Sequence, residues 1–224
     1  MQCYYGAAIL NFEAANPEIE AACKALPYAK VATCAAAECK VGWGFLDRDK
    51  AYKALFAALD SNGDDKVDDA DAEVSIALLG HSWGGTNVAE VGAKLNDDER
   101  VAPSRKKIEL AVVWDPYRPG FTLEPSANFT RFVVLRQSLT PDGDCSERVG
   151  SYKGLAPRCP AGQLCEDYNY SLSPQVDFPT YPSGTLRGDR VGHCDVVDVG
   201  VPVANALLAD TAPVLPASVP VQAP

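Results

Sequence analysis

A serine flanked by closely spaced glycines is the feature that most constrains how this chain can fold. Residues 80–85 read Gly-His-Ser-Trp-Gly-Gly and directly follow an apolar run at residues 74–79. A helix-like segment comes next, at residues 86–95. The apolar run is typical of a buried strand, and a glycine two positions either side of Ser82 allows a close backbone approach that larger residues would block. The pattern predicts a strand, a sharp turn and a helix, with Ser82 at the turn.

A serine at such a turn has a chemical consequence. Its hydroxyl stands above the edge of the sheet at the N-terminus of a helix, which is the layout of a nucleophile elbow. The backbone N–H of Trp83 would there be able to stabilise an oxyanion. The alternative is a glycine-rich turn with a solvated serine. Gly-x-Ser-x-Gly alone is a weak motif. We favour the catalytic interpretation because here a strand-like run precedes the motif and a helix-like segment follows it.

A serine nucleophile needs a general base, and the chain has only two histidines, His81 and His193. His81 directly precedes the serine, so its side chain is expected to leave the turn in another direction. His193 lies late in the chain, in a loop-like segment at residues 190–195. We therefore predict that His193 is the base.

Three aspartates are candidates for the acid that orients this histidine. Asp115 ends the predicted strand at residues 108–114, where a carboxylate would point into the crevice at the end of a sheet. Asp142 and Asp144 follow the next predicted strand, at residues 129–136. We favour Asp115, with Asp142 and Asp144 as the alternatives.

Strand-like and helix-like segments alternate through most of the chain, which predicts an α/β fold with mostly parallel strands and helices on both faces. The expected strands are residues 4–11, 30–34, 74–79, 108–114 and 129–136, and the expected helices are residues 17–26, 49–59 and 86–95. Residues 140–190 read as loops. One domain is expected over residues 1–201, followed by an Ala/Val/Pro-rich tail at 202–224 that is disordered after a short helix near 204–209.

The motif at residues 80–85, the Asp115-Pro116 pair and the Gly192-His193 pair resemble the serine lipases and esterases of the α/β-hydrolase fold. In the pancreatic-lipase-like branch the acid also lies in an Asp-Pro after the strand that follows the elbow. The resemblance implies Ser82 as nucleophile, Asp115 as acid and His193 as base. It covers residues 74–116 well and the rest of the chain only by the order of the motifs.

The chain departs from that family in two respects. The segment before the elbow has room for only two or three strands, which suggests a minimal α/β-hydrolase sheet of about five strands, as in cutinases. A His-Gly-Gly-Gly oxyanion loop is also missing, so the second oxyanion donor would come from the end of the first strand, around Asn11 or Phe12.

The expected activity is the hydrolysis of carboxylic esters by a Ser-His-Asp acyl-enzyme route, with lipid esters favoured by the resemblance alone. A thioesterase or acyl transferase would use the same three residues. A non-catalytic calcium-binding module on a hydrolase scaffold is the third alternative.

An acidic segment at residues 60–71, just before the strand that carries Ser82, predicts a calcium site. Its spacing is that of an EF-hand loop, and it resembles the dockerin variant in ending with Asp rather than Glu. The predicted ligands are Asp60, Asn62, Asp64, Asp68 and Asp71, with Lys66 contributing its backbone carbonyl. Asp65 replaces the usual sixth-position glycine, although Asp tolerates the left-handed backbone better than most residues. The alternative is an acidic, solvated linker.

Eight cysteines favour an oxidising, extracellular setting. They lie at positions 3, 23, 34, 39, 145, 159, 165 and 194. The short separations predict the bridges Cys34–Cys39 and Cys159–Cys165, and Cys145–Cys194 would then tie two loops near the site together. Residues 1–30 do not read as a signal peptide, so a mature or trimmed secreted form is expected.

The charge and hydropathy of the chain argue against nucleic-acid binding, anionic membrane surfaces and a transmembrane helix. The formal net charge is −10, and the longest basic cluster is residues 105–107, so nucleic acid and anionic membrane surfaces are unexpected partners. No apolar stretch reaches the roughly 18 residues that a transmembrane helix needs. The expected partner is a small-molecule or lipid ester, and the sequence indicates no protein partner.

Overall fold

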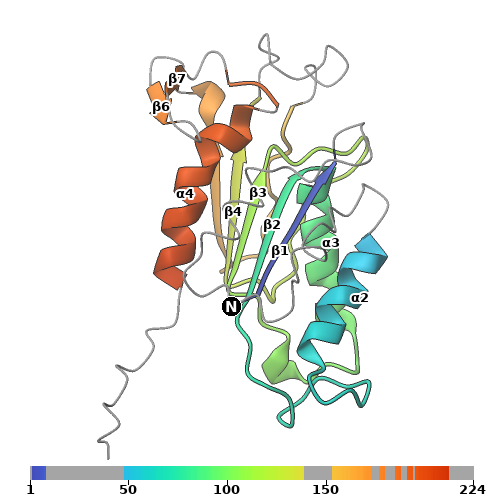
Figure 1. Cartoon of the computed structure of the whole chain (residues 1–224). Coiled ribbons are helices and arrows are strands. Elements are labelled where there is room, and N and C mark those ends of the chain that lie inside the picture. Colours follow the sequence, from blue (N-terminus) through green and yellow to red (C-terminus); the bar gives the residue numbers. More distant parts are fainter. Residues whose placement is uncertain are drawn as a thin grey trace, which may run out of the picture.

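The protein is built around a parallel sheet with helices on both faces (Figure 1). The computed structural model describes residues 2–8, 48–138, 153–172, 177–179, 185–187, 191–193 and 195–211. Its main sheet has the order β1-β2-β3-β4-β5, and every neighbouring pair is parallel. The strands are β1 (Gln2–Ala8), β2 (Ile76–Ser82), β3 (Leu110–Trp114), β4 (Arg131–Arg136) and β5 (Leu164–Asn169).

The central strands are continuous apolar runs because both of their faces are covered. Every residue of β2 and β3 is buried. Along β2, Ala77 and Leu79 belong to one hydrophobic cluster, while Ile76 and Leu78 belong to another on the opposite face. This alternation is the two-residue period of a strand, and it divides the core into two layers.

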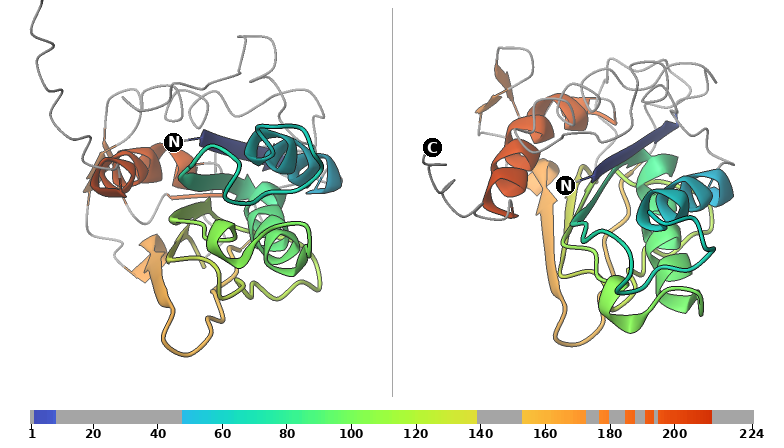
Figure 2. Two further views of the ribbon diagram at one scale, coloured as in Figure 1. Left: turned by 90° about the horizontal axis from the view of Figure 1, so that it is seen from below. Right: turned by 60° about the horizontal axis from the view of Figure 1, so that its bottom comes forward.

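Helices α2 (Arg48–Leu59) and α3 (Trp83–Asp97) supply one layer, and α4 (Asp195–Thr211) supplies the other. Figure 2 shows α4 on the opposite side of the sheet from α2 and α3. Because parallel strands share a direction, the carboxyl ends of β2, β3 and β4 meet at one edge of the sheet. Beside this arrangement a separate antiparallel pair joins β6 (Asp177–Pro179) to β7 (Thr185–Arg187). The α/β arrangement expected from the sequence, with parallel strands between helices, is confirmed.

Strand β5 lies in the segment expected to consist of loops, so that expectation was wrong. Its sequence, LCEDYN, has no apolar run, because β5 pairs only with β4 and is half exposed. Ion pairs link it to its neighbour: Arg131 to Glu166 at 2.5 Å and Arg136 to Asp167 at 2.7 Å. The register places both ion pairs diagonally, two residues out of step, and such pairs between neighbouring strands stabilise a sheet without leaving an apolar signal in the sequence.

Helix α4 is the second correction. The helix expected near residues 204–209 is present, but it is longer than expected, because it begins at Asp195 and runs to Thr211. Leu207 and other α4 residues are buried against the sheet. Valines, Gly200 and an internal Pro202 give the segment poor helix propensity, and burial overrides that propensity. A Cβ on Gly200 would overlap the Trp114 ring, so glycine allows the close approach of α4 to β3.

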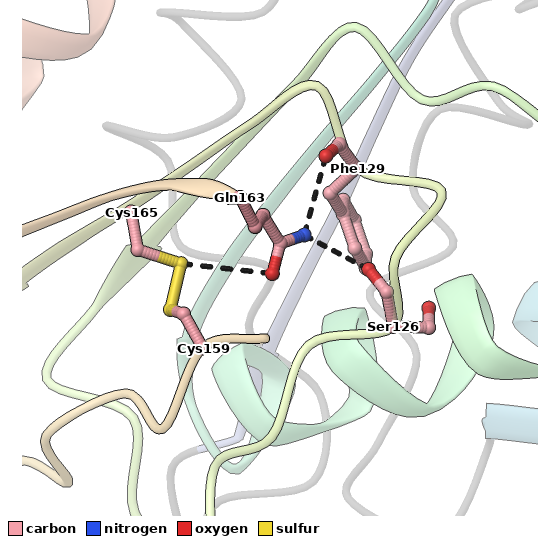
Figure 3. The surroundings of a disulfide bond; sticks show 5 residues. All are labelled: Ser126, Phe129, Cys159, Gln163 and Cys165. Atoms are coloured by element: carbon pink, nitrogen blue, oxygen red, sulfur yellow. Dashed lines mark hydrogen bonds between the residues drawn. A yellow bond between two sulfur atoms is a disulfide. The ribbon is translucent and has the colours of Figure 1, made fainter. Parts of the chain in front are cut away.

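A disulfide closes the short loop that leads into β5, as Figure 3 shows. Cys159 and Cys165 are bonded, as the sequence predicted. The bridge encloses Gln163, whose side-chain amide donates to the backbone oxygens of Ser126 at 2.9 Å and Phe129 at 3.2 Å. The strand at residues 30–34, the helix at 17–26 and the predicted bridges Cys34–Cys39 and Cys145–Cys194 lie outside the described residues.

Candidate active site

Ser82 occupies a strained turn between β2 and α3. It is the last residue of β2, Trp83 begins α3, and Ser82 has φ 55° and ψ −123°. A residue other than glycine at positive φ needs support from the surrounding structure. Part of that support is the close approach of backbone either side of the serine: a Cβ added to Gly80 would lie only 2.5 Å from the carbonyl oxygen of Gly84. The lack of a Cβ at Gly80 therefore permits the turn that presents the serine.

The structure brings Ser82, His193 and Asp115 together. The hydroxyl of Ser82 lies 2.8 Å from Nε2 of His193, and Nδ1 of His193 lies 2.5 Å from a carboxylate oxygen of Asp115. Because a carboxylate accepts, Nδ1 carries the proton, and Nε2 is left to accept from the serine hydroxyl. All three side chains are buried, at 3%, 1% and 0% exposure respectively. The arrangement can remove a proton from the serine as it attacks.

Asp115 directly follows β3, at φ 38°, where the sheet ends. Its carboxylate accepts hydrogen bonds from the backbone N–H of Gln137 at 2.9 Å and from the Gln137 side-chain amide at 3.2 Å. Burial raises the pKa of Asp115 above its ordinary value, while the hydrogen bonds from His193 and Gln137 oppose that rise. Asp142 and Asp144, the alternative acids, lie outside the described residues.

Two residues that hold Asp115 were missed by the sequence analysis. Gln137 directly follows β4, and a polar residue after a buried strand is the signal that would have identified it. Gly154 packs so closely against Asp115 that an added Cβ would overlap the carboxylate. Its N–H donates to the carbonyl of Gln137 at 2.9 Å. No local pattern around Gly154 indicates this contact, which joins residues far apart in the chain.

Tyr117 and Arg118 border the serine from the loop after β3. The N–H of Tyr117 donates to the carbonyl of Ser82 at 3.1 Å, which ties this loop to the elbow. The Tyr117 ring meets the His193 ring edge-on, with centroids 6.5 Å apart. Arg118 forms a two-point ion pair with Glu90 of α3, at 2.7 and 3.1 Å, and its guanidinium lies 5.9 Å from the Trp83 ring.

Trp83 is the first residue of α3, so its backbone N–H points out of the helix N-terminus beside the serine. The sequence predicts a second oxyanion donor near the end of the first strand. The register pairs Ala8, the last residue of β1, with Ser82, so the chain leaves β1 next to the serine. Asn11 and Phe12 themselves lie outside the described residues.

His81 takes a position that the sequence did not predict in detail. Its side chain is 0% exposed, and its Nε2 donates to the backbone carbonyl of His193 at 2.8 Å. Burial, with a smaller contribution from the nearby His193, lowers the pKa of His81 to about 3. His81 is therefore neutral at physiological pH, and it contacts the backbone of the proposed base rather than the serine.

The acidic loop lies far from this edge of the sheet, before the start of β2. Its side chains cap its own backbone: Asp60 accepts from Gly63, Asp64 and Asp65, and Asn62 accepts from Asp64. Asp65 has φ 64°, the left-handed conformation usual for glycine at the sixth position of a calcium loop. Val67 is buried and forms a β-bridge to Val101, which anchors the loop to the segment after α3.

The last predicted ligand, Asp71, is buried, and its carboxylate accepts from the N–H groups of Ser61, Asn62 and Asp68 at 2.7 to 3.2 Å. These hydrogen bonds, the one from Asp68 foremost, lower the pKa of Asp71 below its ordinary value. In the described part of the chain, no group of three or more His, Cys, Asp or Glu side chains is arranged to hold a metal ion. The carboxylates of Asp60 and Asp71 serve in this structure as acceptors for the loop's own N–H groups.

Two further findings bear on function. Among the described residues, no helix combines the length and the apolarity that a membrane-spanning segment requires. No protein-family model and no curated protein matches the sequence.

Proposed function

We propose that this protein is a serine hydrolase of the α/β-hydrolase type that cleaves carboxylic esters through an acyl-enzyme. The observation that carries the proposal is the buried chain of hydrogen bonds from Ser82 through His193 to Asp115. A surface serine or a structural histidine would need neither the strained backbone at Ser82 nor a buried carboxylate behind the imidazole. Such an arrangement is recognised by geometry and roles rather than by sequence position.

The proposed reaction begins with attack of Ser82 Oγ on the ester carbonyl while Nε2 of His193 takes the hydroxyl proton. Asp115 keeps the proton on Nδ1 and stabilises the imidazolium that forms. The N–H of Trp83 donates to the developing oxyanion. His193 then protonates the departing alcohol, and water hydrolyses the acyl-enzyme with His193 again acting as base.

A fluorophosphonate probe tests the proposal directly, because it reacts only with an activated serine. We expect covalent labelling that maps to Ser82, and loss of both labelling and ester hydrolysis in Ser82→Ala, by about 10⁴-fold or more. Ser104→Ala, which alters an exposed serine outside the site, is the matched control and is expected to retain full activity. Full ester turnover by Ser82→Ala would refute the assignment. Calcium binding without any labelling would favour a non-catalytic module.

The substrate class within this proposal is a small-molecule or lipid ester, by resemblance alone. A thioesterase or acyl transferase would use the same three side chains. A series of p-nitrophenyl esters of increasing acyl length, compared with the matching acyl thioesters, separates these activities. The bridge between Cys159 and Cys165 supports an oxidising, extracellular location, which remains part of the proposal.

We further propose that the loop at residues 60–71 binds one structural Ca²⁺. Asp60, Asn62, Asp64, Asp68 and Asp71, with the carbonyl of Lys66, would hold it. The positive φ of Asp65 supports this proposal. Calcium would neutralise clustered carboxylates where the chain enters β2, and it takes no part in the chemistry because the serine lies at the other end of that strand.

Calcium that binds only the folded state would stabilise it by about 2.7 kcal/mol at a hundredfold excess over Kd. We expect EDTA to lower Tm by several degrees, and Asp64→Ala to abolish that response. Asp69→Ala, in the same loop but outside the ligand positions, is the control. A melting curve that does not change with EDTA would identify the loop as an acidic linker.

A further inference from the structure

His81 links the strand that carries the nucleophile to the segment that carries the proposed base. It precedes Ser82 in β2 and, like Leu79, faces the layer that contains α4. Its Nε2 lies 2.8 Å from the carbonyl oxygen of His193, although the two residues are 112 positions apart in the chain. The two imidazole rings lie 4.9 Å apart and are tilted by 36°.

The bond determines how the His81 ring is protonated. A carbonyl oxygen only accepts, so Nε2 must carry the proton, and in the neutral ring Nδ1 then holds a lone pair. That Nδ1 is buried and has no hydrogen-bond partner among the residues that the structure describes. An unpaired buried nitrogen costs free energy that an apolar side chain would avoid. Filling the core therefore does not explain a histidine at this position, whereas the bond to His193 does.

Described hydrogen bonds hold the backbone of the segment that carries His193 at two places, one within its own loop and one on the sheet. Within its own loop, the N–H of Gly192 donates to the Asp195 side chain at 2.8 Å, and the N–H of Val196 donates to the carbonyl of Gly192 at 3.1 Å. Both bonds hold the segment to the start of α4, not to the sheet. The hydrogen bond from His81 ties the backbone of His193 to β2 itself. Because Ser82 is the next residue of that strand, one element then sets the positions of both the serine and the histidine.

We propose that His81 is a positioning residue, which holds the backbone of His193 at the distance from Ser82 that proton transfer requires. This inference rests on the proposed hydrolase function. His81 touches neither the serine nor a substrate, and it acts through His193. A misplacement of about 1 Å between reacting groups can cost about 10²-fold in rate, so loss of this anchor is expected to lower kcat while leaving KM nearly unchanged.

Substitutions of His81 that keep or remove a donor within reach of the His193 carbonyl test the proposal. In His81→Gln, the side-chain amide extends as far as Nε2 of histidine and can donate to the same carbonyl. In His81→Asn, the amide is too short to reach it, and in His81→Phe the ring fills the space without a donor. We expect kcat for a p-nitrophenyl ester to fall roughly 10²-fold in the Phe and Asn variants, with KM within about threefold of the wild type. The Gln variant should recover at least tenfold of that loss.

The thermal stability of each variant is measured alongside the kinetics, and variants are compared at temperatures where all are folded. If His81→Phe does not fold, the comparison of Gln with Asn carries the test, since both introduce a buried amide. A kcat in His81→Asn equal to that of His81→Gln would overturn the proposal, as would a wild-type kcat in His81→Phe. Failure of the hydrolase function itself looks different, because the wild-type protein would then show no Ser82-dependent turnover or labelling.

Discussion

Replacing Gly154 by alanine tests how precisely the site depends on the placement of Asp115. Gly154 is buried between the segments that follow β3 and β4: its N–H donates to the carbonyl of Gln137 at 2.9 Å, and the next N–H, of Leu155, donates to the carbonyl of Pro116 at 2.7 Å. These bonds hold Gly154 against the carboxylate of Asp115. The Gly154→Ala variant would add one methyl group where the structure leaves no room for it.

The geometry sets the size of the effect. The added Cβ would overlap Oδ1 of Asp115 and would lie 2.6 Å from Cβ of Arg136, whereas ordinary contacts begin at 3.4 Å. Neither neighbour is the far end of a flexible side chain, because Cβ of Arg136 is bound to the β4 backbone and Asp115 is held by Gln137 and His193. The Asp115 carboxylate must therefore move by about 1 Å, which corresponds to a loss of about 10²-fold in kcat. Complete loss of its function would cost about 10⁴-fold, which sets the upper limit.

Steady-state hydrolysis of a p-nitrophenyl ester, together with the free energy of unfolding, measures both consequences. Overpacking is expected to cost about 1–3 kcal/mol of stability in addition to the loss of kcat. Gly92→Ala is the matched control, because its Cβ would overlap the Phe129 ring in the layer of α3, away from Asp115. We expect that control to lose stability but to keep its kcat. A Gly154→Ala variant with kcat within threefold of the wild type would refute the reasoning.

Three further predictions concern the acid, pH and the disulfide. Asp115→Asn should lower kcat by roughly 10³–10⁴-fold and Asp142→Asn only slightly, and the reverse ranking in steady-state kinetics would move the acid to the later loop. Folding lowers the pKa of His81 from 6.5 to about 3. At pH values between these two, His81 therefore binds a proton in the unfolded chain but not in the folded protein. The free energy of unfolding contributed by His81 should therefore fall by about 2 kcal/mol from pH 7 to pH 5, and urea titrations of His81→Gln should lack that share of the pH dependence. Replacing Cys159 and Cys165 together by alanine should cost about 2 kcal/mol in the same urea titration with kcat unchanged, since the bridge closes a short loop at the opposite end of β5 from the site.

The elements nearest the serine could be predicted from the sequence, because each is encoded by a strong local pattern. Helix α2 was expected at residues 49–59 and is Arg48–Leu59. The apolar run before Ser82 and the glycines around it specify a buried strand and a tight turn through backbone sterics alone. With only two histidines in the chain, one of them beside the serine, the choice of His193 as the expected base needed no tertiary information.

Tertiary structure decided what these local patterns do not encode. Burial against the sheet makes residues 195–211 a helix despite Gly200 and Pro202. Strand β5 has no apolar run, and it is held by backbone pairing with β4 and by two ion pairs to it. Three contacts at the site join residues that are 22 to 112 positions apart and meet only in the folded chain. They are the contacts of Gln137 and of Gly154 with Asp115, and that of His81 with the carbonyl of His193. Local sequence determines which turns and strands can form. The packing of two layers on a parallel sheet determines which side chains meet at its edge, because that packing depends on the whole chain at once.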